Sequence, residues 1–242
     1  KPVITHAINA SDAVTAVSQS LKDDTMAQFP VTVDIDVVHN FVCPSHFDRE
    51  PDLAFRQQLS PQGAPVLCHI SNFRPVKRVL DVVEVFAQVR NAQPATLLMV
   101  GDGPDRAKAE ARSRELGVDQ DVVFLGKVKN PIEPLLISDL LLLPSETESF
   151  GLVALEAMAA GVPVISSNVG GLAEVNAEGE TGHLCEVGHV DQMASRALEV
   201  LQGDALPKFK ARAVSRANDF TIDRILPQYL EVYLRALTLS AS

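Results

Sequence analysis

Two carboxylates stand where a ligand could use them, beside and within an apolar helix predicted over residues 150–160. Glu148 precedes this helix, and Glu156 is the only charged residue inside it, with seven residues between the two. A helix this apolar is mostly buried, so its carboxylate must be paired, solvated at one edge or bound to a ligand. The residues alone leave these alternatives open, including a Glu156 that lies on a solvent-exposed stripe of the helix.

The beginning of the same helix offers groups that prefer the opposite charge. The backbone amides of Gly151, Leu152 and Val153, which follow Phe150, have no partner within the helix. Such amides bind anions, whereas carboxylates accept hydrogen bonds from hydroxyl groups. Because a phosphorylated sugar carries both phosphate and hydroxyl groups, the sequence predicts a site for one here. Taken alone, Glu148 is also typical of an acidic residue that favours a helix N-terminus.

Two cations, Arg74 and Lys77, follow a strand predicted over residues 66–70 and precede a helix predicted over residues 79–91. Cations at the N-terminus of a helix oppose its dipole, which disfavours a merely solvated helix start. An arginine can hold a phosphate with two parallel hydrogen bonds, and a lysine acts as a point charge. We therefore interpret both side chains as placed for an anion.

Gly101 and Gly103 follow the next predicted strand, over residues 96–100, and resemble the start of a dinucleotide-binding fingerprint. Arg106 occupies the third glycine position of that pattern, so a tight turn between strand and helix is the more frequent meaning of the pair. Lys127 follows a further predicted strand in the same way. Each of these loops adds polar groups after a strand.

The elements that must position these residues are apolar strands that alternate with helices from residue 65 onward. The strands are predicted over residues 66–70, 96–100, 122–125, 139–143, 164–165 and 183–187. This pattern predicts an α/β fold of the Rossmann-like, doubly wound kind, with a parallel sheet covered on both faces. Ligands bind beyond the carboxyl ends of such strands, so we expect the polar loops to meet at one rim.

The composition and charge exclude several classes of partner. A net charge of −10 over 242 residues argues against nucleic acid or an anionic membrane surface. No apolar run is long enough to span a membrane. Cys43, Cys68 and Cys185 lack the spacing of a metal site or a disulfide framework, which favours a reducing, cytoplasmic compartment. We predict no metal and no cofactor, and the oligomeric state, including a homo-oligomer, stays open.

Several blocks of the chain resemble the signature of glycosyltransferase family 4. They cover residues 148–159, 161–164 and 169–174, with further matches at residues 101–104 and 123–126. That family has the GT-B fold, retains the configuration at the transferred sugar and uses activated sugars. Residues 8–18 and 71–78 look like the branch that serves the bacillithiol pathway. This branch implies transfer of N-acetylglucosamine from UDP-GlcNAc to a small acceptor, L-malate.

The resemblance implies a role for each matching residue. Glu148 would contact hydroxyl groups of the donor sugar near the reaction centre, and Glu156 would accept from the ribose hydroxyl groups. The backbone over residues 151–153 would hold sugar or phosphate oxygens, and the segment near Lys127 would meet the uracil edge. The predicted donor-binding residues are Glu156, Phe150, Gly151, Leu152, Val153, Lys127, Gly101 and Gly103.

Arg74 and Lys77 would neutralise the diphosphate as it leaves, so Glu148, Arg74 and Lys77 are the predicted catalytic residues. Fixed cations of this kind make a metal ion unnecessary. The chain departs from the family in one respect, because the usual arginine is spaced further from its lysine than Arg74 is from Lys77.

A GT-B enzyme has two Rossmann-like domains with catalysis between them, and the resemblance divides the chain accordingly. We predict that residues 1–46 are the tail of the N-terminal domain, with strands at 2–5, 13–17 and 36–42 and a helix over 18–29. Residues 47–64 are then a linker, and residues 65–220 are the C-terminal, nucleotide-sugar-binding domain. Residues 221–242 are predicted as a helix that crosses back to the first domain.

We expect residues upstream of Lys1 in the whole protein, and we therefore expect this chain to bind a donor without turnover. Three other functions stay open at this stage. They are a family 4 enzyme with another donor or acceptor, a UDP-sugar epimerase, and a nucleotide-sugar-binding module without catalysis.

Overall fold

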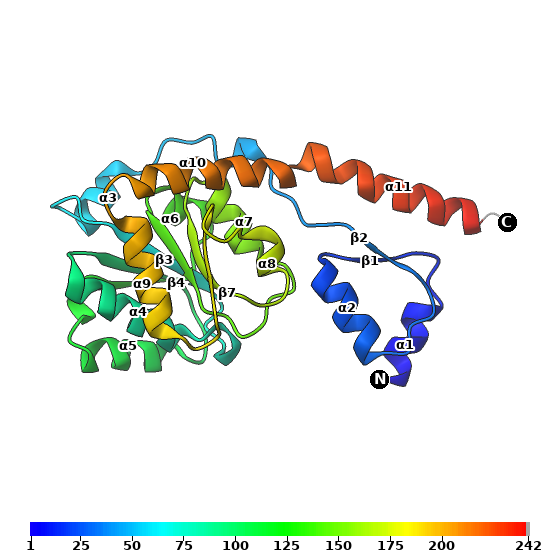
Figure 1. Cartoon of the computed structure of the whole chain (residues 1–242), viewed down its shortest axis with the longest axis horizontal. Helices are drawn as coiled ribbons and strands as arrows, with labels where there is room; N and C mark the ends of the chain where they lie inside the picture. The colour runs from blue at the N-terminus through cyan, green and yellow to red at the C-terminus, as the bar shows by residue number, and fades with distance from the viewer. Residues whose placement is uncertain (241–242) are drawn as a thin grey trace.

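The computed structural model describes residues 1–240, and its larger part is a parallel sheet of six strands in the order β5-β4-β3-β6-β7-β8 (Figure 1). The strands are β3 (Val66–Ser71), β4 (Thr96–Gly101), β5 (Val122–Gly126), β6 (Leu140–Leu143), β7 (Val164–Ser167) and β8 (Gly182–Cys185). Every neighbouring pair is parallel. The predicted α/β fold is therefore confirmed.

Helices cover both faces of this sheet. Consecutive side chains of a strand point to opposite faces, and here both sets are apolar and buried. Leu97 and Met99 pack into a core with α4 and α9, whereas Leu98 and Val100 pack into a second core with α7 and α10. The helices of the first face are α4 (Val79–Ala92), α5 (Arg106–Glu115) and α9 (Val190–Leu201); those of the second are α3 (Leu53–Leu59), α6 (Ile132–Leu136), α7 (Leu152–Ala159), α8 (Leu172–Val175) and α10 (Ala205–Ala217). Burial on both faces explains the continuous apolar strands.

The N-terminal residues form a smaller unit with its own two-stranded parallel sheet. Its elements are α1 (Pro2–Asn9), β1 (Val14–Ala16), α2 (Gln19–Gln28) and β2 (Ile35–Val37). The strand predicted over residues 2–5 is wrong: Pro2 occupies the first turn of a helix, where its fixed φ and missing amide suit it. The strand predicted over residues 36–42 ends at Val37.

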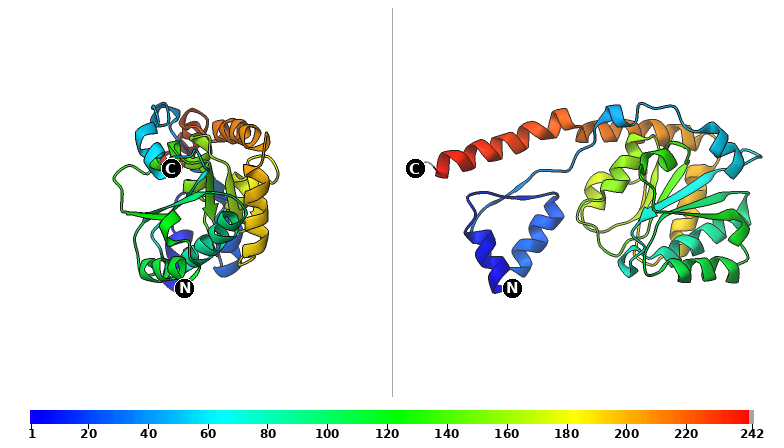
Figure 2. Two further views of the ribbon diagram at one scale, coloured as in Figure 1. Left: turned by 90° about the vertical axis from the view of Figure 1, so that its left-hand side faces the viewer. Right: turned by 180° about the vertical axis from the view of Figure 1, so that it is seen from behind.

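Two segments cross between the smaller and the larger unit, and they pair with each other. Val42 forms an isolated parallel bridge with Thr221, and its amide donates to the carbonyl of Phe220 at 2.9 Å. From there α11 (Ile222–Ser240) extends out over the two-stranded sheet, as Figures 1 and 2 show. The α11 residue Arg235 forms an ion pair with Asp36 of β2. Within residues 1–240, no helix is long and apolar enough to cross a membrane.

The segment predicted as a linker, residues 47–64, contains helix α3 and is fixed to the larger unit. Arg56 of α3 donates to the buried carboxylate of Asp139 at 2.7 Å, and Lys210 of α10 donates to the other oxygen of that carboxylate at 2.7 Å. Two cations and the amide of Val66 therefore satisfy this buried charge. The boundaries of the predicted domains stay a prediction.

Candidate functional site

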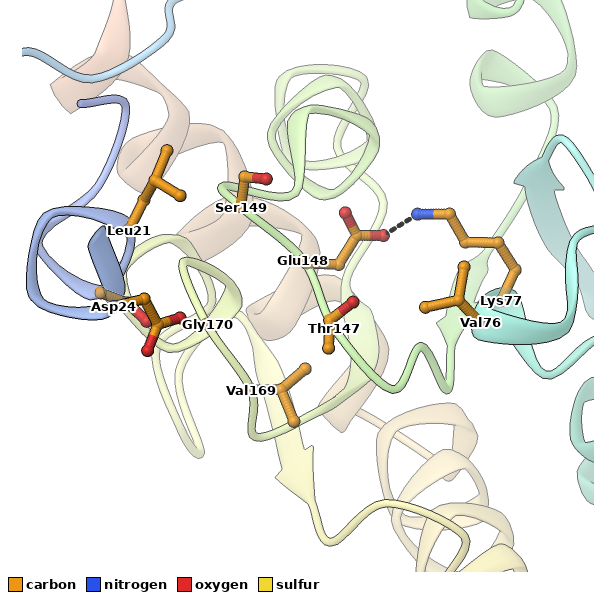
Figure 3. Close-up of a pocket in the computed structure, with 10 residues that line it drawn as sticks. Leu21, Asp24, Val76, Lys77, Thr147, Glu148, Ser149, Val169 and Gly170 are labelled. Atoms are coloured by element: carbon orange, nitrogen blue, oxygen red, sulfur yellow. Dashed lines mark hydrogen bonds and ion pairs between the residues drawn. The ribbon is translucent and has the colours of Figure 1, made fainter. Parts of the chain in front are cut away.

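The loops that follow β3, β6 and β7 meet at one rim of the sheet and enclose a cavity of about 350 Å³ (Figure 3). Helix α2 of the smaller unit forms the opposite wall. The cavity is lined by Ser20, Leu21, Asp24, Val76, Lys77, Thr147, Glu148, Ser149, Val169 and Gly170. Because the parallel strands end at the same rim, the polar loops that follow them converge there as expected and position these side chains.

Lys77 and Glu148 lie side by side in the lining of the cavity, and the amine of Lys77 donates to Oε1 of Glu148. The hydroxyl of Ser145 donates to the same oxygen at 3.1 Å. The two charged side chains are mostly buried, with 21% and 17% of their surfaces exposed. The site thus holds a cation and a carboxylate that can act on a phosphate and a hydroxyl group respectively. Two of the three predicted catalytic residues are brought together.

A directed chain of hydrogen bonds beneath Lys77 shapes its loop. Nδ1 of the fully buried His69 lies 2.8 Å from the carbonyl of Leu142, which can only accept, so Nδ1 carries the proton. Nε2 then accepts from the hydroxyl of Ser71 at 2.8 Å, and that hydroxyl accepts from the amide of Phe73 at 3.2 Å. Burial and, to a smaller extent, the charge of Lys77 lower the pKa of His69 to about 4, against the opposing effect of the bond to Leu142.

Phe73 itself has a backbone conformation that few residues other than glycine adopt. Its φ is +41° and its ring is fully buried. The hydrogen bond from its amide to Ser71 and the burial of its ring offset this strain. The loop from Asn72 to Arg78 is therefore held by the core rather than by its own sequence preferences.

Gly101 and Gly103 are required by the packing of this same loop. A side chain at Gly101 would lie 1.8 Å from the carbonyl oxygen of Ser71, and one at Gly103 would lie 2.1 Å from the carbonyl oxygen of Asn72. Gly101 also has a φ of +122°. The structure thus gives both glycines a packing role, and their predicted contact with the donor stays a prediction.

The loop that carries Glu148 is held between its two neighbours. The amide of Glu146 donates to the carbonyl of Val76 at 2.8 Å, and the amide of Gly171 donates to the carbonyl of Glu148 at 3.0 Å. A side chain at Gly170 would lie 1.9 Å from the carbonyl oxygen of Glu148. The glycine pair in the block over residues 169–174 is needed for this close approach.

Helix α7 begins at Leu152, two residues after the predicted start at residue 150, because Gly151 adopts a left-handed φ of +87° as the N-cap. The first backbone amides of α7 receive no side-chain cap, and Leu152 is 41% exposed. Phe150 is buried and its ring packs against His39 and Phe220. Only the backbone of Phe150 therefore remains for the donor contact that the sequence predicts.

Glu156 is half-buried on α7, and in the described part of the chain its carboxylate has neither a hydrogen bond nor an ion pair. Burial raises its pKa above the usual range. Of the alternatives left open by the sequence, pairing with another side chain is therefore wrong. A half-buried carboxylate that lacks a partner is costly, and it is a free acceptor for hydroxyl groups.

Arg74 and Lys127 are exposed, and neither forms an ion pair or side-chain hydrogen bond within residues 1–240. Arg74, Lys127 and Glu156 do not line the cavity that holds Lys77 and Glu148. Their roles toward a donor stay predictions. No group of three or more metal-ligating side chains occurs in the part of the chain that the structure describes.

The sequence did not reveal that α2 supplies one wall of the site. Ser20, Leu21 and Asp24 lie more than 120 positions from Glu148 in the chain, and nothing in their local pattern marks them. The pairing of β1 with β2, the crossing at Val42 and hydrogen bonds to Ser149 and Glu174 hold α2 at this rim. An α2 start at Ser18 was predictable from its capping hydroxyl.

Solved structures with the same fold include two proteins in complex with UDP. HepE from Anabaena in complex with UDP and glucose has a TM-score of 0.86 and 25% identity, and the match covers 100% of this chain and 66% of HepE. S. aureus TarM, as a mutant in complex with Fondaparinux, alpha-GlcNAc-glycerol and UDP, has a TM-score of 0.81 and 22% identity over 96% of this chain and 46% of TarM. The fold is therefore that of the GT-B glycosyltransferases.

The chain belongs to the family of group 1 glycosyl transferases, which matches residues 52–219. It is 41% identical to the N-acetyl-alpha-D-glucosaminyl L-malate synthase of Bacillus anthracis over 97% of this chain and 62% of that protein. It is 30% identical to a glycogen synthase of Mycobacterium tuberculosis over 95% of this chain and 55% of that protein. The chain thus spans a little over half the length of these curated relatives, and the family resemblance in the sequence is confirmed.

Proposed function

We propose that this chain is the nucleotide-sugar-binding part of a retaining glycosyltransferase and that its donor is a UDP-sugar. The observation that carries the proposal is the unpaired, half-buried carboxylate of Glu156 on α7, the helix whose N-terminal amides also lack a side-chain cap. An acceptor for hydroxyl groups and donors for phosphates on one short helix suit a nucleotide sugar. The complex of HepE with UDP and glucose supports a donor of this class.

In this proposal Glu156 accepts hydrogen bonds from the ribose hydroxyl groups, and the amides of Gly151, Leu152 and Val153 hold the phosphates. Glu148 accepts from a hydroxyl group of the transferred sugar while Lys77 neutralises the diphosphate. The bond between the anomeric carbon and the diphosphate breaks, and the acceptor oxygen bonds to that carbon from the same face. The hydroxyl proton of the acceptor leaves with the diphosphate, whose growing charge Lys77 and the amides stabilise.

The finer part of the proposal names UDP-GlcNAc as the donor and L-malate as the small acceptor. It is supported by the 41% identity with the N-acetyl-alpha-D-glucosaminyl L-malate synthase of Bacillus anthracis. Because the chain spans only 62% of that relative, we expect it to bind the donor but to need the rest of such a protein for transfer. Acceptor-dependent release of UDP by the longer protein would separate a transferase from an epimerase or a binding module.

Calorimetric titration of UDP into this chain, with ADP as the reference ligand, tests the proposal. We expect one site that prefers UDP. Glu156→Gln should raise the dissociation constant of UDP at least about tenfold, because a hydrogen bond to a charged group contributes roughly 1.5–3 kcal/mol. Glu180→Gln is the matched control, because Glu180 is exposed and its side chain has no partner in the described chain.

A folded chain that does not bind UDP, or that prefers ADP, would contradict a UDP-sugar donor. Equal weakening by Glu156→Gln and Glu180→Gln would show that the loss of affinity is not specific to Glu156. Unchanged affinity in Glu156→Gln would remove the ribose role of Glu156 while leaving the family unaffected.

A further inference from the structure

A third carboxylate, that of Glu174, reaches the smaller unit. It lies on α8, at the end of the block over residues 169–174. One of its oxygens accepts from the amide of Ser20 at 2.9 Å, and the other accepts from the amide of Gln19 at 3.0 Å. Nε2–H of His39 donates to this second oxygen at 3.1 Å. Glu174 therefore binds two separate segments of the N-terminal part of the chain.

The two amides that Glu174 accepts from are the first two of helix α2. The first turn of α2 contains no acidic residue of its own. The third amide, of Leu21, donates to the hydroxyl of Ser18 at 3.0 Å, and that hydroxyl in turn donates to the carbonyl of Ser149 at 2.6 Å. A residue more than 150 positions away thus supplies the negative charge that a helix N-terminus favours.

Glu174 is itself held rigidly on the turn that supports Glu148. The guanidinium of Arg216 donates to the backbone carbonyls of Glu174 at 2.6 Å and Val175 at 3.3 Å, and it stacks on the ring of Phe220 at 4.8 Å. On the other side, a side chain at Gly171 would lie 2.5 Å from the carbonyl oxygen of Ser149. The turn over residues 168–174 is therefore wedged between α10 and the loop of Glu148.

These contacts tie one wall of the cavity to the other. Leu21 and Asp24 of α2 lie across the cavity from Lys77 (Figure 3). The only described side-chain bonds between α2 with its cap and the opposite rim are those of Glu174 to Gln19 and Ser20 and that of Ser18 to Ser149. Burial raises the pKa of Glu174, but the bonds from Ser20, Gln19 and His39 outweigh burial and keep the pKa below its usual range.

We propose that Glu174 is a positioning residue: it fixes α2, and with it the α2 wall of the cavity, against the loop that carries Glu148. Ser18 and His39 complete this clamp from the side of the smaller unit. The hydrogen bonds of Glu174 are observed in the structure, whereas their importance for sugar transfer rests on the proposed function. The glycine pair and the glutamate of this block then act together. The glycines allow the turn to approach the loop of Glu148 closely, and the glutamate binds the first amides of α2.

The rival explanation is that Glu174 only caps α2 locally. Amide hydrogen exchange and a distance measurement between the two units distinguish the two roles. The variant is Glu174→Gln, and Glu180→Gln is the charge-matched control on an exposed side chain. Spin labels at Met26→Cys and Lys208→Cys, both exposed positions, report the spread of distances by pulsed electron resonance in a Cys43→Ser background.

We expect the amides of Gln19 and Ser20 to exchange about tenfold faster in Glu174→Gln than in Glu180→Gln, and the distance distribution to broaden only in Glu174→Gln. Ser18→Ala, which cuts the bond to Ser149, should broaden it as well and serves if Glu174→Gln does not fold. Faster exchange with an unchanged distribution would reduce Glu174 to a local cap and overturn the proposal. No change in either measurement would overturn it too.

Neither measurement needs a nucleotide, so the clamp and the proposed function can fail separately. If UDP does not bind the wild-type chain while Glu174→Gln broadens the distances as expected, the donor assignment fails and the clamp stands. If UDP binds but Glu174→Gln leaves the distances unchanged, the clamp fails and the donor site stands.

Discussion

Glu148 and Glu156 lie at the two ends of one short segment, yet their surroundings differ in kind. At the loop end, Glu148 accepts from Lys77 and from the hydroxyl of Ser145. At the helix end, Glu156 has no polar partner among the described residues, and burial raises its pKa. The first carboxylate is part of a neutral pair with Lys77, and we call this the paired end. The second is an isolated half-buried charge, and we call this the unpaired end.

This difference shows what each end is suited to do. A mostly buried lysine–glutamate pair can exchange partners, because a ligand that brings both an anion and a hydroxyl group satisfies both members at once. An isolated carboxylate is stabilised by a ligand that donates hydrogen bonds to it, because these bonds offset the cost of its burial. The loop end therefore suits the reacting part of a sugar diphosphate, and the helix end suits a passive hydroxyl-bearing part.

The largest effect is expected from breaking the paired end with Lys77→Met. This change removes a cation from the site and leaves Glu148 mostly buried without its partner, where it repels a diphosphate. We expect the dissociation constant of UDP to rise about 100-fold, which corresponds to roughly 3 kcal/mol for charge-assisted bonds. Calorimetric titration of UDP, together with a thermal melt to confirm folding, measures this.

Lys208→Met is the control for that experiment, because Lys208 is exposed and its side chain has no partner in the part of the chain that the structure describes. It should leave the affinity for UDP unchanged. If Lys77→Met binds UDP as the control does, the paired end is not a diphosphate site, and the contrast between the two carboxylates would have only structural meaning.

A second way to sharpen the contrast is to lower the pH, because the loop that carries Lys77 rests on the neutral, buried His69. The folded-state pKa of His69 is lowered to about 4 from an ordinary value near 6.5, so the unfolded chain binds the proton first. Stability from this residue is therefore complete above about pH 6.5 and is lost as pH falls toward 4. The loss amounts to about 3 kcal/mol.

Chemical unfolding at a series of pH values, in the wild type and in His69→Gln, measures this contribution. The wild type should lose stability more steeply than the variant between pH 6.5 and 4, because the variant has no proton to bind at this position. Parallel curves would show that His69 is not the group that couples the loop of Lys77 to pH.

Much of the fold could be predicted from the sequence because local pattern determines it. The apolar strands from Val66 onward and the helices between them follow from burial on both faces, and Ser18 marks the start of α2 through its hydroxyl. The helix at Pro2 was missed because Val3 to Thr5 have strand-like side chains, and the exposed surroundings that decide the outcome are not local.

The site was predictable to the extent that its residues follow strands. Lys77 and Glu148 converge as expected, and Glu156 is half-buried as its apolar helix implies. The contact of Glu174 with α2 could not be foreseen, because it joins residues more than 150 positions apart and depends on how two units pack. The same is true of Phe150, whose ring serves that packing.

The smallest effect is expected at the unpaired end, and it has the opposite sign. Glu156→Gln should raise the free energy of unfolding at pH 7 by about 1 kcal/mol or less, because it removes an unpaired half-buried charge. The folded-state pKa of Glu156 is raised, so the wild type recovers stability on protonation as pH falls, and the advantage of the variant should shrink toward pH 4.5. Chemical unfolding at both pH values measures it. A variant that is less stable at pH 7 would mean that Glu156 has a stabilising partner in solution, and the contrast with Glu148 would then disappear.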